Sequence, residues 1–169
     1  MTADQHLTDL ETRAACLVNP ASGIANDYLN VFNEVLLLIE NLPILLPEMI
    51  ADLEQWRPQT YQEYFSKSPL PGSDKALAVY ETLDPDLREC FEMKIAEVAA
   101  IANEGKAIVR AAQERSGVVE PDDISDSCGA LAAKLRERLM EATDIVNNGL
   151  HTRAPQAQVL ADRLMKLSA

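Results

Sequence analysis

Apolar positions recur at helical spacing along most of the chain, and most regularly between residues 85 and 147. The first stripe alternates in steps of four and three, the spacing of a coiled-coil seam. It consists of Leu87, Phe91, Ile95, Val98, Ala102, Gly105, Val109 and Ala112. The second stripe consists of Ile124, Cys128, Leu131, Leu135, Leu139, Ala142 and Val146. Because a short link joins two long amphipathic segments, the pattern predicts an antiparallel helical hairpin over 85–147.

The ends of this hairpin carry start and stop signals. Asp84 followed by Pro85 is typical of a helix start, since aspartate caps and proline suits the first helical position. Asn148 and Gly149 are suitable residues for a helix end. Small residues in the second half of the first stripe, such as Gly105, allow another helix to approach closely.

Shorter helices are predicted on either side of the hairpin. The apolar spacing and the proline positions place them at about 3–17, 20–41, 47–56, 59–66 and 73–83, with a last helix from Pro155. The segment 20–41 is apolar around much of its circumference, so it must be covered on more than one side. The sequence therefore predicts an all-α fold, a single helical bundle of residues 1–169 with 56–72 as an irregular aromatic lobe.

Charge is distributed unevenly along the chain. The net charge is −12 over 169 residues. Nine acids and one base, Arg13, precede residue 57. Such a surface repels phosphate backbones and anionic lipid heads, so we expect neither nucleic acid nor membrane as a partner. A basic protein partner fits this charge, although acidity that only maintains solubility explains it too.

The cysteines and the apolar runs bear on the cellular setting. Cys16, Cys90 and Cys128 lie far apart and form no CxxC pair, which argues against a disulfide framework or a zinc site. The N-terminal sequence lacks the pattern of a signal peptide. The most apolar segment, VLLLIENLPILL, is interrupted by polar residues and proline before it reaches the length of a membrane span. We expect a reducing cytoplasm of bacterial type.

The segment NPASG, residues 19–23, resembles the NPxSG phosphate loop near the start of diacylglycerol and sphingosine kinase catalytic domains. That resemblance implies a nucleotide site in an α/β domain, followed by a glycine-rich GGDGT loop. This chain has six glycines, no two of them adjacent, and no predicted strand. We therefore interpret NPASG as a helix start, with Asn19 as the cap and Pro20 in the first helical position.

Other catalytic and cofactor sites find little support in the sequence. No Glu-x-x-His pair occurs, and His6 and His151 are the only histidines, so we predict no metal site and no cofactor. The most specific enzyme-like alternative is a histidine phosphotransfer module of a bacterial phosphorelay. In that case His151 is the candidate phosphoryl acceptor, ahead of His6.

Four of the eight aromatic residues lie within ten positions, in the least regular part of the chain. They are Trp56, Tyr61, Tyr64 and Phe65. Aromatic anchors are typical of protein interfaces, so these residues are our candidate partner-binding site, and a satellite core is the alternative. We predict a non-enzymatic interaction or regulatory domain, adaptor-like or chaperone-like. We also expect a homodimer, because the apolar surface looks larger than one small bundle covers.

Overall fold

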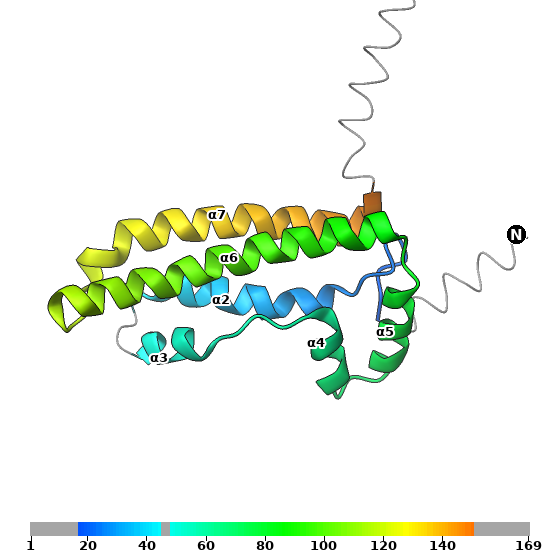
Figure 1. Cartoon of the computed structure of the whole chain (residues 1–169), viewed down its shortest axis with the longest axis horizontal. Coiled ribbons are helices and arrows are strands. Elements are labelled where there is room, and N and C mark those ends of the chain that lie inside the picture. Colours follow the sequence, from blue (N-terminus) through cyan, green and yellow to red (C-terminus); the bar gives the residue numbers. More distant parts are fainter. Residues whose placement is uncertain (1–16, 45–47, 151–169) are drawn as a thin grey trace, which may run out of the picture.

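A computed structural model describes residues 17–44 and 48–150. Six α-helices and one short 3-10 helix make up this part of the chain, which contains no strand (Figure 1). The predicted all-α bundle is confirmed. The predicted helix at 3–17, apart from Leu17, and the one from Pro155 lie outside the described residues.

Two long helices, α6 (Pro85–Ser116) and α7 (Pro121–Asn148), form the predicted antiparallel hairpin. Asp84 caps α6 by accepting the Asp86 N–H at 2.8 Å. The helix ends at Gly117, whose φ of 74° lies in the left-handed region. Glycine reaches this conformation without the Cβ clash that other residues meet, so the chain can turn sharply into α7.

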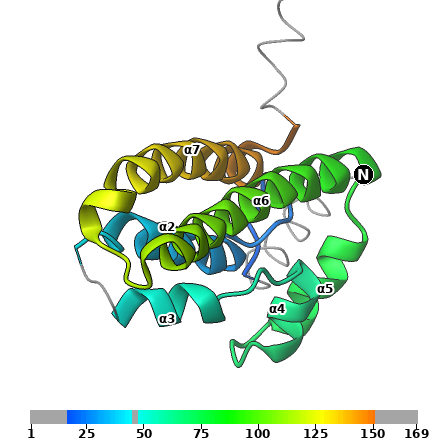
Figure 2. The same ribbon diagram turned by 60° about the vertical axis from the view of Figure 1, so that its left-hand side comes forward.

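The two predicted stripes face the interior of the bundle. All their residues are buried except Ile95, which is half-buried against the same core. Helix α2 (Asn30–Asn41) lies against both arms of the hairpin (Figure 2). Gly105 marks a close approach, because a Cβ built there would lie 2.9 Å from Ile39 Cδ1 of α2. The predicted close packing of a helix on the small residues of α6 is confirmed.

The NPASG segment forms a loop, so the prediction that a helix begins at residue 20 is wrong. The Asn19 carbonyl accepts the Gly23 N–H at 2.7 Å, and the Asn19 side-chain oxygen accepts the Ala21 N–H at 2.9 Å. Gly23 has a φ of 80°, which interrupts a right-handed helix. Asparagine favours both helix caps and tight turns through the same side-chain-to-backbone bonds, so these letters fit either structure.

The helical path after this loop starts with η1 (Asn26–Leu29) and continues directly into α2. Helix α2 has buried residues on most of its surface, as predicted for 20–41, and α3, α6 and α7 cover it. Leu37 is an exception, with 57% of its surface exposed.

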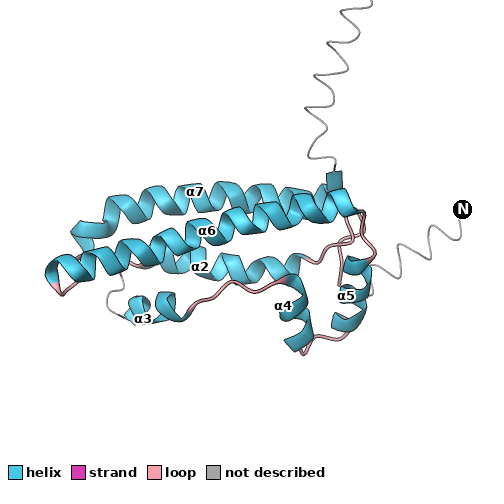
Figure 3. Ribbon diagram, viewed as in Figure 1, coloured by secondary structure: helices cyan, strands magenta, loops and turns pink. Residues whose placement is uncertain are grey.

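Three shorter helices, joined by loops, complete the fold: one lies beneath one end of the long helices, and the other two lie together near the opposite end (Figure 3). They are α3 (Glu48–Gln55), α4 (Tyr61–Lys67) and α5 (Ser73–Glu81). Each lies close to its predicted range. Gly72 occupies the cap position of α5, and Ser73 is the first helical residue, donating to the Leu70 carbonyl at 2.7 Å.

Candidate interaction site

All eight aromatic residues of the chain form one continuous network, which we call the aromatic cluster. Tyr28 is its hub, with ring centroids of four others between 5.2 and 6.1 Å away. The other members are Phe32, Trp56, Tyr61, Tyr64, Phe65, Tyr80 and Phe91. Most of the pairs meet edge to face, the geometry that aromatic quadrupoles favour. The cluster joins η1 and α2 to α4, α5 and the first half of α6.

The four predicted partner-binding residues differ in exposure. Trp56, Tyr61 and Phe65 are buried, and Tyr64 is half-buried. The satellite-core alternative describes the environment of the three buried rings. Tyr64 is the member that reaches the surface, where its hydroxyl donates to the Asp27 carboxylate. A direct partner contact through the cluster therefore stays a prediction, and Tyr64 is the member most open to it.

Residues 56–60 connect α3 to α4 without helical structure, and we call them the strap. The Trp56 indole N–H donates to the Val31 carbonyl of α2 at 2.9 Å. Lys106 of α6 donates to the Trp56 carbonyl. The Tyr28 hydroxyl donates to the Gln59 carbonyl at 2.6 Å. These bonds hold the strap over the junction of α2 and α6, and the last two satisfy the strap carbonyls of Trp56 and Gln59, which no helix pairs.

The buried tyrosines act as neutral hydrogen-bonding groups. Burial raises the pKa of Tyr61 to about 12, with a smaller opposing effect from the bond to the Ala25 N–H. Burial also raises the pKa of Tyr28 and of Tyr80, and the neighbouring carboxylate of Glu92 adds to both effects. Because a phenol with a raised pKa is a weak proton donor to substrates, these groups hold structure rather than transfer protons.

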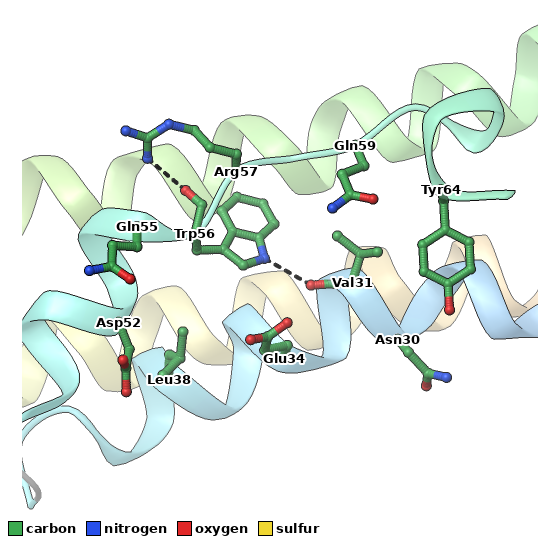
Figure 4. A pocket seen from close by; sticks show the side chains of 10 residues that line it. All are labelled: Asn30, Val31, Glu34, Leu38, Asp52, Gln55, Trp56, Arg57, Gln59 and Tyr64. Carbon is green, nitrogen blue, oxygen red and sulfur yellow. Dashed lines mark hydrogen bonds between the residues drawn. The ribbon is translucent and has the colours of Figure 1, made fainter. Parts of the chain in front are cut away.

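A groove of about 570 Å³ lies between α2 and the strap (Figure 4). We call it the acidic groove. Side chains that line it include Asn30, Glu34, Asp52, Gln55, Trp56, Arg57 and Tyr64. The Trp56 indole lies between the strap and α2, with its N–H directed at the Val31 carbonyl, so the groove has one aromatic wall held rigidly in place.

The charge of the acidic groove is not neutralised by the chain itself. Glu34 and Asp52 form no ion pair with any described residue. Residues 17–56 contain six acids and no lysine or arginine. Arg57 is the first base after them, and it donates to the carbonyls of Glu54 and Trp56 at the end of α3. The groove therefore presents two exposed carboxylates and one base, Arg57, whose guanidinium bonds backbone carbonyls rather than either carboxylate.

Several acids outside the acidic groove form ion pairs with lysine or arginine. Glu40 of α2 pairs with Arg136 of α7. Lys94 of α6 lies 2.7 Å from a Glu141 carboxylate oxygen of α7, and Arg138 bonds the same carboxylate at 3.0 Å. The first two pairs join α2 and α6 to α7, and the third lies within α7, in contrast to the unpaired acids of the groove.

The residues that the structure describes bear on the histidine, cysteine, metal-site and membrane predictions. His151 and His6 lie outside the described residues, so their surroundings are not part of this site. Burial raises the pKa of the Cys128 thiol, which disfavours the reactive thiolate. Within residues 17–44 and 48–150, no three acidic, histidine or cysteine side chains come together as metal ligands. None of the described helices is long and apolar enough to cross a membrane.

Sequence reasoning missed two parts of this site. It grouped four aromatics and overlooked Tyr28, Phe32, Tyr80 and Phe91, which lie far from them along the chain and join them only by folding. It also found the acidic first third without placing any carboxylate in a groove.

Comparisons with protein families, with curated proteins and with solved structures find no significant match for this chain.

Proposed function

We propose that this protein is a non-enzymatic interaction domain, adaptor-like or chaperone-like, that binds a basic segment of a protein partner in the acidic groove. The observation that carries the proposal is the pair of carboxylates, Glu34 of α2 and Asp52 of α3, which line one groove and form no ion pair with Arg57 or any other described residue. A lysine or arginine side chain between them would supply the missing positive charge.

The other walls suit such a segment as well. Trp56 forms a buried, rigidly held aromatic wall, and Tyr64 is the ring of the groove that reaches the surface. Asn30 and Gln55 offer side-chain amides that can bond a partner backbone in either direction. Leu38 also lines the groove, so an apolar residue of the partner has a place beside the charged one. Mixed polar, aromatic and apolar linings are common at non-obligate interfaces.

Charge disfavours several other classes of partner. Nucleic acids and anionic lipid surfaces would meet the unpaired carboxylates with their own negative charge. Two copies of this chain would likewise repel one another if they met groove to groove.

A homodimer is a separate part of the proposal and would use a different surface. Most of the apolar surface of α2, which suggested a dimer, is covered within the chain by α3, α6 and α7. Leu37, 57% exposed, and Ile44, 76% exposed, are the large apolar side chains left uncovered at this end of α2. Light scattering at several protein concentrations tests the dimer, and a strictly monomeric result would remove it.

The binding proposal is tested by calorimetric titration with two designed peptides. One has arginines and leucines at helical spacing, and the other has the same pattern with glutamates in place of arginines. We expect saturable binding of the arginine peptide alone, weakened by added salt because exposed charges are screened. The double variant Glu34→Gln with Asp52→Asn should bind about two- to thirtyfold more weakly, since exposed ion pairs contribute about 0.2–1 kcal/mol each.

A matched control removes the same two charges elsewhere. Glu114 on α6 and Asp126 on α7 are exposed and form no ion pair in the described part of the chain, so Glu114→Gln with Asp126→Asn changes net charge equally. We expect this control to bind the arginine peptide like the wild type. Equal weakening by both double variants would show attraction by net charge alone, and would contradict a site in the groove.

A further inference from the structure

A second cavity lies on the α6 side of the strap and has a volume of about 370 Å³. We call it the aromatic pocket. Pro58 and Thr60 of the strap form one side, and Ile95, Ala96 and Ala99 of α6 form the other. Members of the aromatic cluster, themselves almost fully buried, form its floor. A largely apolar cavity of roughly 300–1,000 Å³ with a few polar groups is the usual form of a small-molecule site.

The charged group that lines this pocket is the carboxylate of Glu92, an exposed residue of α6, and Gln59, Thr60 and Gln62 line it as well. One of its oxygens accepts the Tyr80 hydroxyl at 2.8 Å, which orients the carboxylate toward the aromatic floor. Glu92 forms no ion pair among the described residues, although Arg88 precedes it by one helical turn. Glu63 on the neighbouring α4 is also unpaired, and its charge acts on Tyr28 in the floor. The charged groups nearest the floor are therefore carboxylates.

We propose that the aromatic pocket binds a small amphipathic amine, with its apolar body between Pro58 and Ala96 and its cationic nitrogen at the free oxygen of Glu92. An ammonium group completes a charge-assisted bond that the protein leaves unmade. Ala96 and Ala99 are small, so the α6 wall leaves room for a flat or narrow apolar group. The electron-rich edges of the pocket, tyrosine hydroxyls and a carboxylate, disfavour an anion at the same place.

The pocket is distinct from the acidic groove, because the strap separates them. Its occupant is a free small molecule rather than a protein segment, since the volume suits one compact group and the walls converge on a single carboxylate. The two proposals can therefore fail independently, and each has variants that leave the other site unchanged.

Three ligands of equal size test this proposal: 4-phenylbutylamine, 4-phenylbutanol and 4-phenylbutyrate. They share one apolar body and differ in charge. The readout is the methyl resonance of Ile95, which lines the pocket, with Ile124 at the start of α7 as a distant reference. We expect a saturable shift at Ile95 with the amine, no shift at Ile124, and an affinity about three- to tenfold above that of the alcohol.

Two variants separate the charge from the cavity. Glu92→Gln keeps an oxygen for the Tyr80 hydroxyl and should abolish the preference for the amine over the alcohol. Ala96→Leu fills the mouth from an exposed helical position that tolerates leucine, and should weaken both ligands while the unfolding temperature holds. The control Asp126→Asn should bind all three ligands like the wild type.

Several results would overturn the proposal. These are an anion that binds as well as the amine, equal shifts at Ile95 and Ile124, or an amine preference that survives Glu92→Gln. A lysine-containing peptide that shifts Ile95 at lower concentration than 4-phenylbutylamine would also overturn it, because the occupant would then be a protein side chain.

Discussion

Lys106 of α6 holds Trp56 of the strap in two ways: its ammonium group donates to the Trp56 carbonyl and lies 5.7 Å from the centre of the indole ring. The contact joins positions 50 residues apart and fixes the aromatic wall of the acidic groove. Lys106 is itself buried, with 7% of its surface exposed. A buried ammonium is costly unless it is bonded, so this contact fixes both partners.

Lys106→Met tests what the ammonium contributes. The Trp56 carbonyl keeps a second donor, the Arg57 guanidinium at 2.8 Å, and methionine keeps the stem of the side chain. We therefore expect the free energy of unfolding at neutral pH to change by less than about 1 kcal/mol. Lys106→Ala, which also leaves a cavity, should cost more, about 2 kcal/mol or above. Urea unfolding of both variants measures this, and equal losses would contradict the expectation.

The same residue predicts a dependence on alkaline pH. Burial lowers the pKa of Lys106, and the charges of Arg57 and Arg110 lower it further, while Glu54 opposes them. A folded-state pKa below the unfolded one means that the unfolded chain binds more protons, so this lysine adds stability as pH rises toward 10. The difference in unfolding free energy between wild type and Lys106→Met should shift in favour of wild type from pH 7 to 10. No shift would contradict a lowered pKa.

Gly105 and Ile39 predict a packing effect that a double-mutant cycle can isolate. A Cβ at Gly105 would lie 2.9 Å from Ile39 Cδ1 and 3.2 Å from its Cγ1, so Gly105→Ala forces Ile39 to move. Ile39→Val removes the nearer carbon. We expect the double variant to be more stable than the sum of the two single changes predicts, by about 0.5 kcal/mol or more.

Gly129 provides the control for this cycle. It lies in α7 on an exposed surface, and nothing approaches a Cβ built there within 4 Å. Gly129→Ala should therefore stabilise the protein by about 0.5–1 kcal/mol through helix propensity alone. Thermal and urea unfolding measure both glycines, and additive effects at Gly105 and Ile39 would contradict the close approach.

Sequence reasoning succeeded where local signals and long periodicity agreed. Asp84 with Pro85 marks the start of α6, and the stripe that follows stays on one face for the whole helix. Because the cap signal and the apolar stripe both favour a helix, tertiary contacts do not readily change the secondary structure of this segment. Helix existence and type were therefore predictable for α6 and α7, and nearly so for α3, α4 and α5.

The loop at NPASG shows why the rest was not predictable. Ser22 donates to the Val146 carbonyl at 2.6 Å, a contact across 124 residues that helps hold the loop against the end of α7. No sequence pattern near Ser22 predicts the Val146 carbonyl as its hydrogen-bond acceptor. The acidic groove and the aromatic pocket depend in the same way on the strap crossing two helices that are distant in the chain.

Ser22→Ala distinguishes the loop from a helix start. Ser22 is buried, and its hydroxyl also accepts the Ile24 N–H at 3.1 Å, so its loss leaves two buried groups without this partner. We expect a cost of about 1–3 kcal/mol. The exposed Ser125 of α7 is the control, and Ser125→Ala should stay within about 0.5 kcal/mol. A cost at Ser22 as small as at Ser125 would favour the helix start.

The buried tyrosines predict a loss of stability in alkali. The pKa of Tyr61 is raised to about 12, and those of Tyr28 and Tyr80 are also raised, mainly by burial. Their neutral forms are therefore favoured in the folded state. This contribution is complete below the unfolded pKa of about 10 and declines as pH rises from there, by up to about 1.4 kcal/mol per pH unit for each tyrosine.

Absorbance at the phenolate band measures this directly. In the folded protein, the four tyrosines should ionise well above pH 10, and in urea all four should ionise near pH 10. Circular dichroism in parallel shows whether the helices persist. Ionisation of all four near pH 10 with the helices intact would contradict the burial of Tyr28, Tyr61 and Tyr80 in one cluster.

The emission of Trp56 tests the proposed function most directly, because it is the only tryptophan in the chain and it lines the acidic groove. Titration with the arginine peptide should change this emission saturably, with an apparent affinity that falls as salt is added, and the glutamate peptide should leave it unchanged. Binding of the arginine peptide with no change in Trp56 emission, or equal responses to both peptides, would contradict a basic partner in this groove.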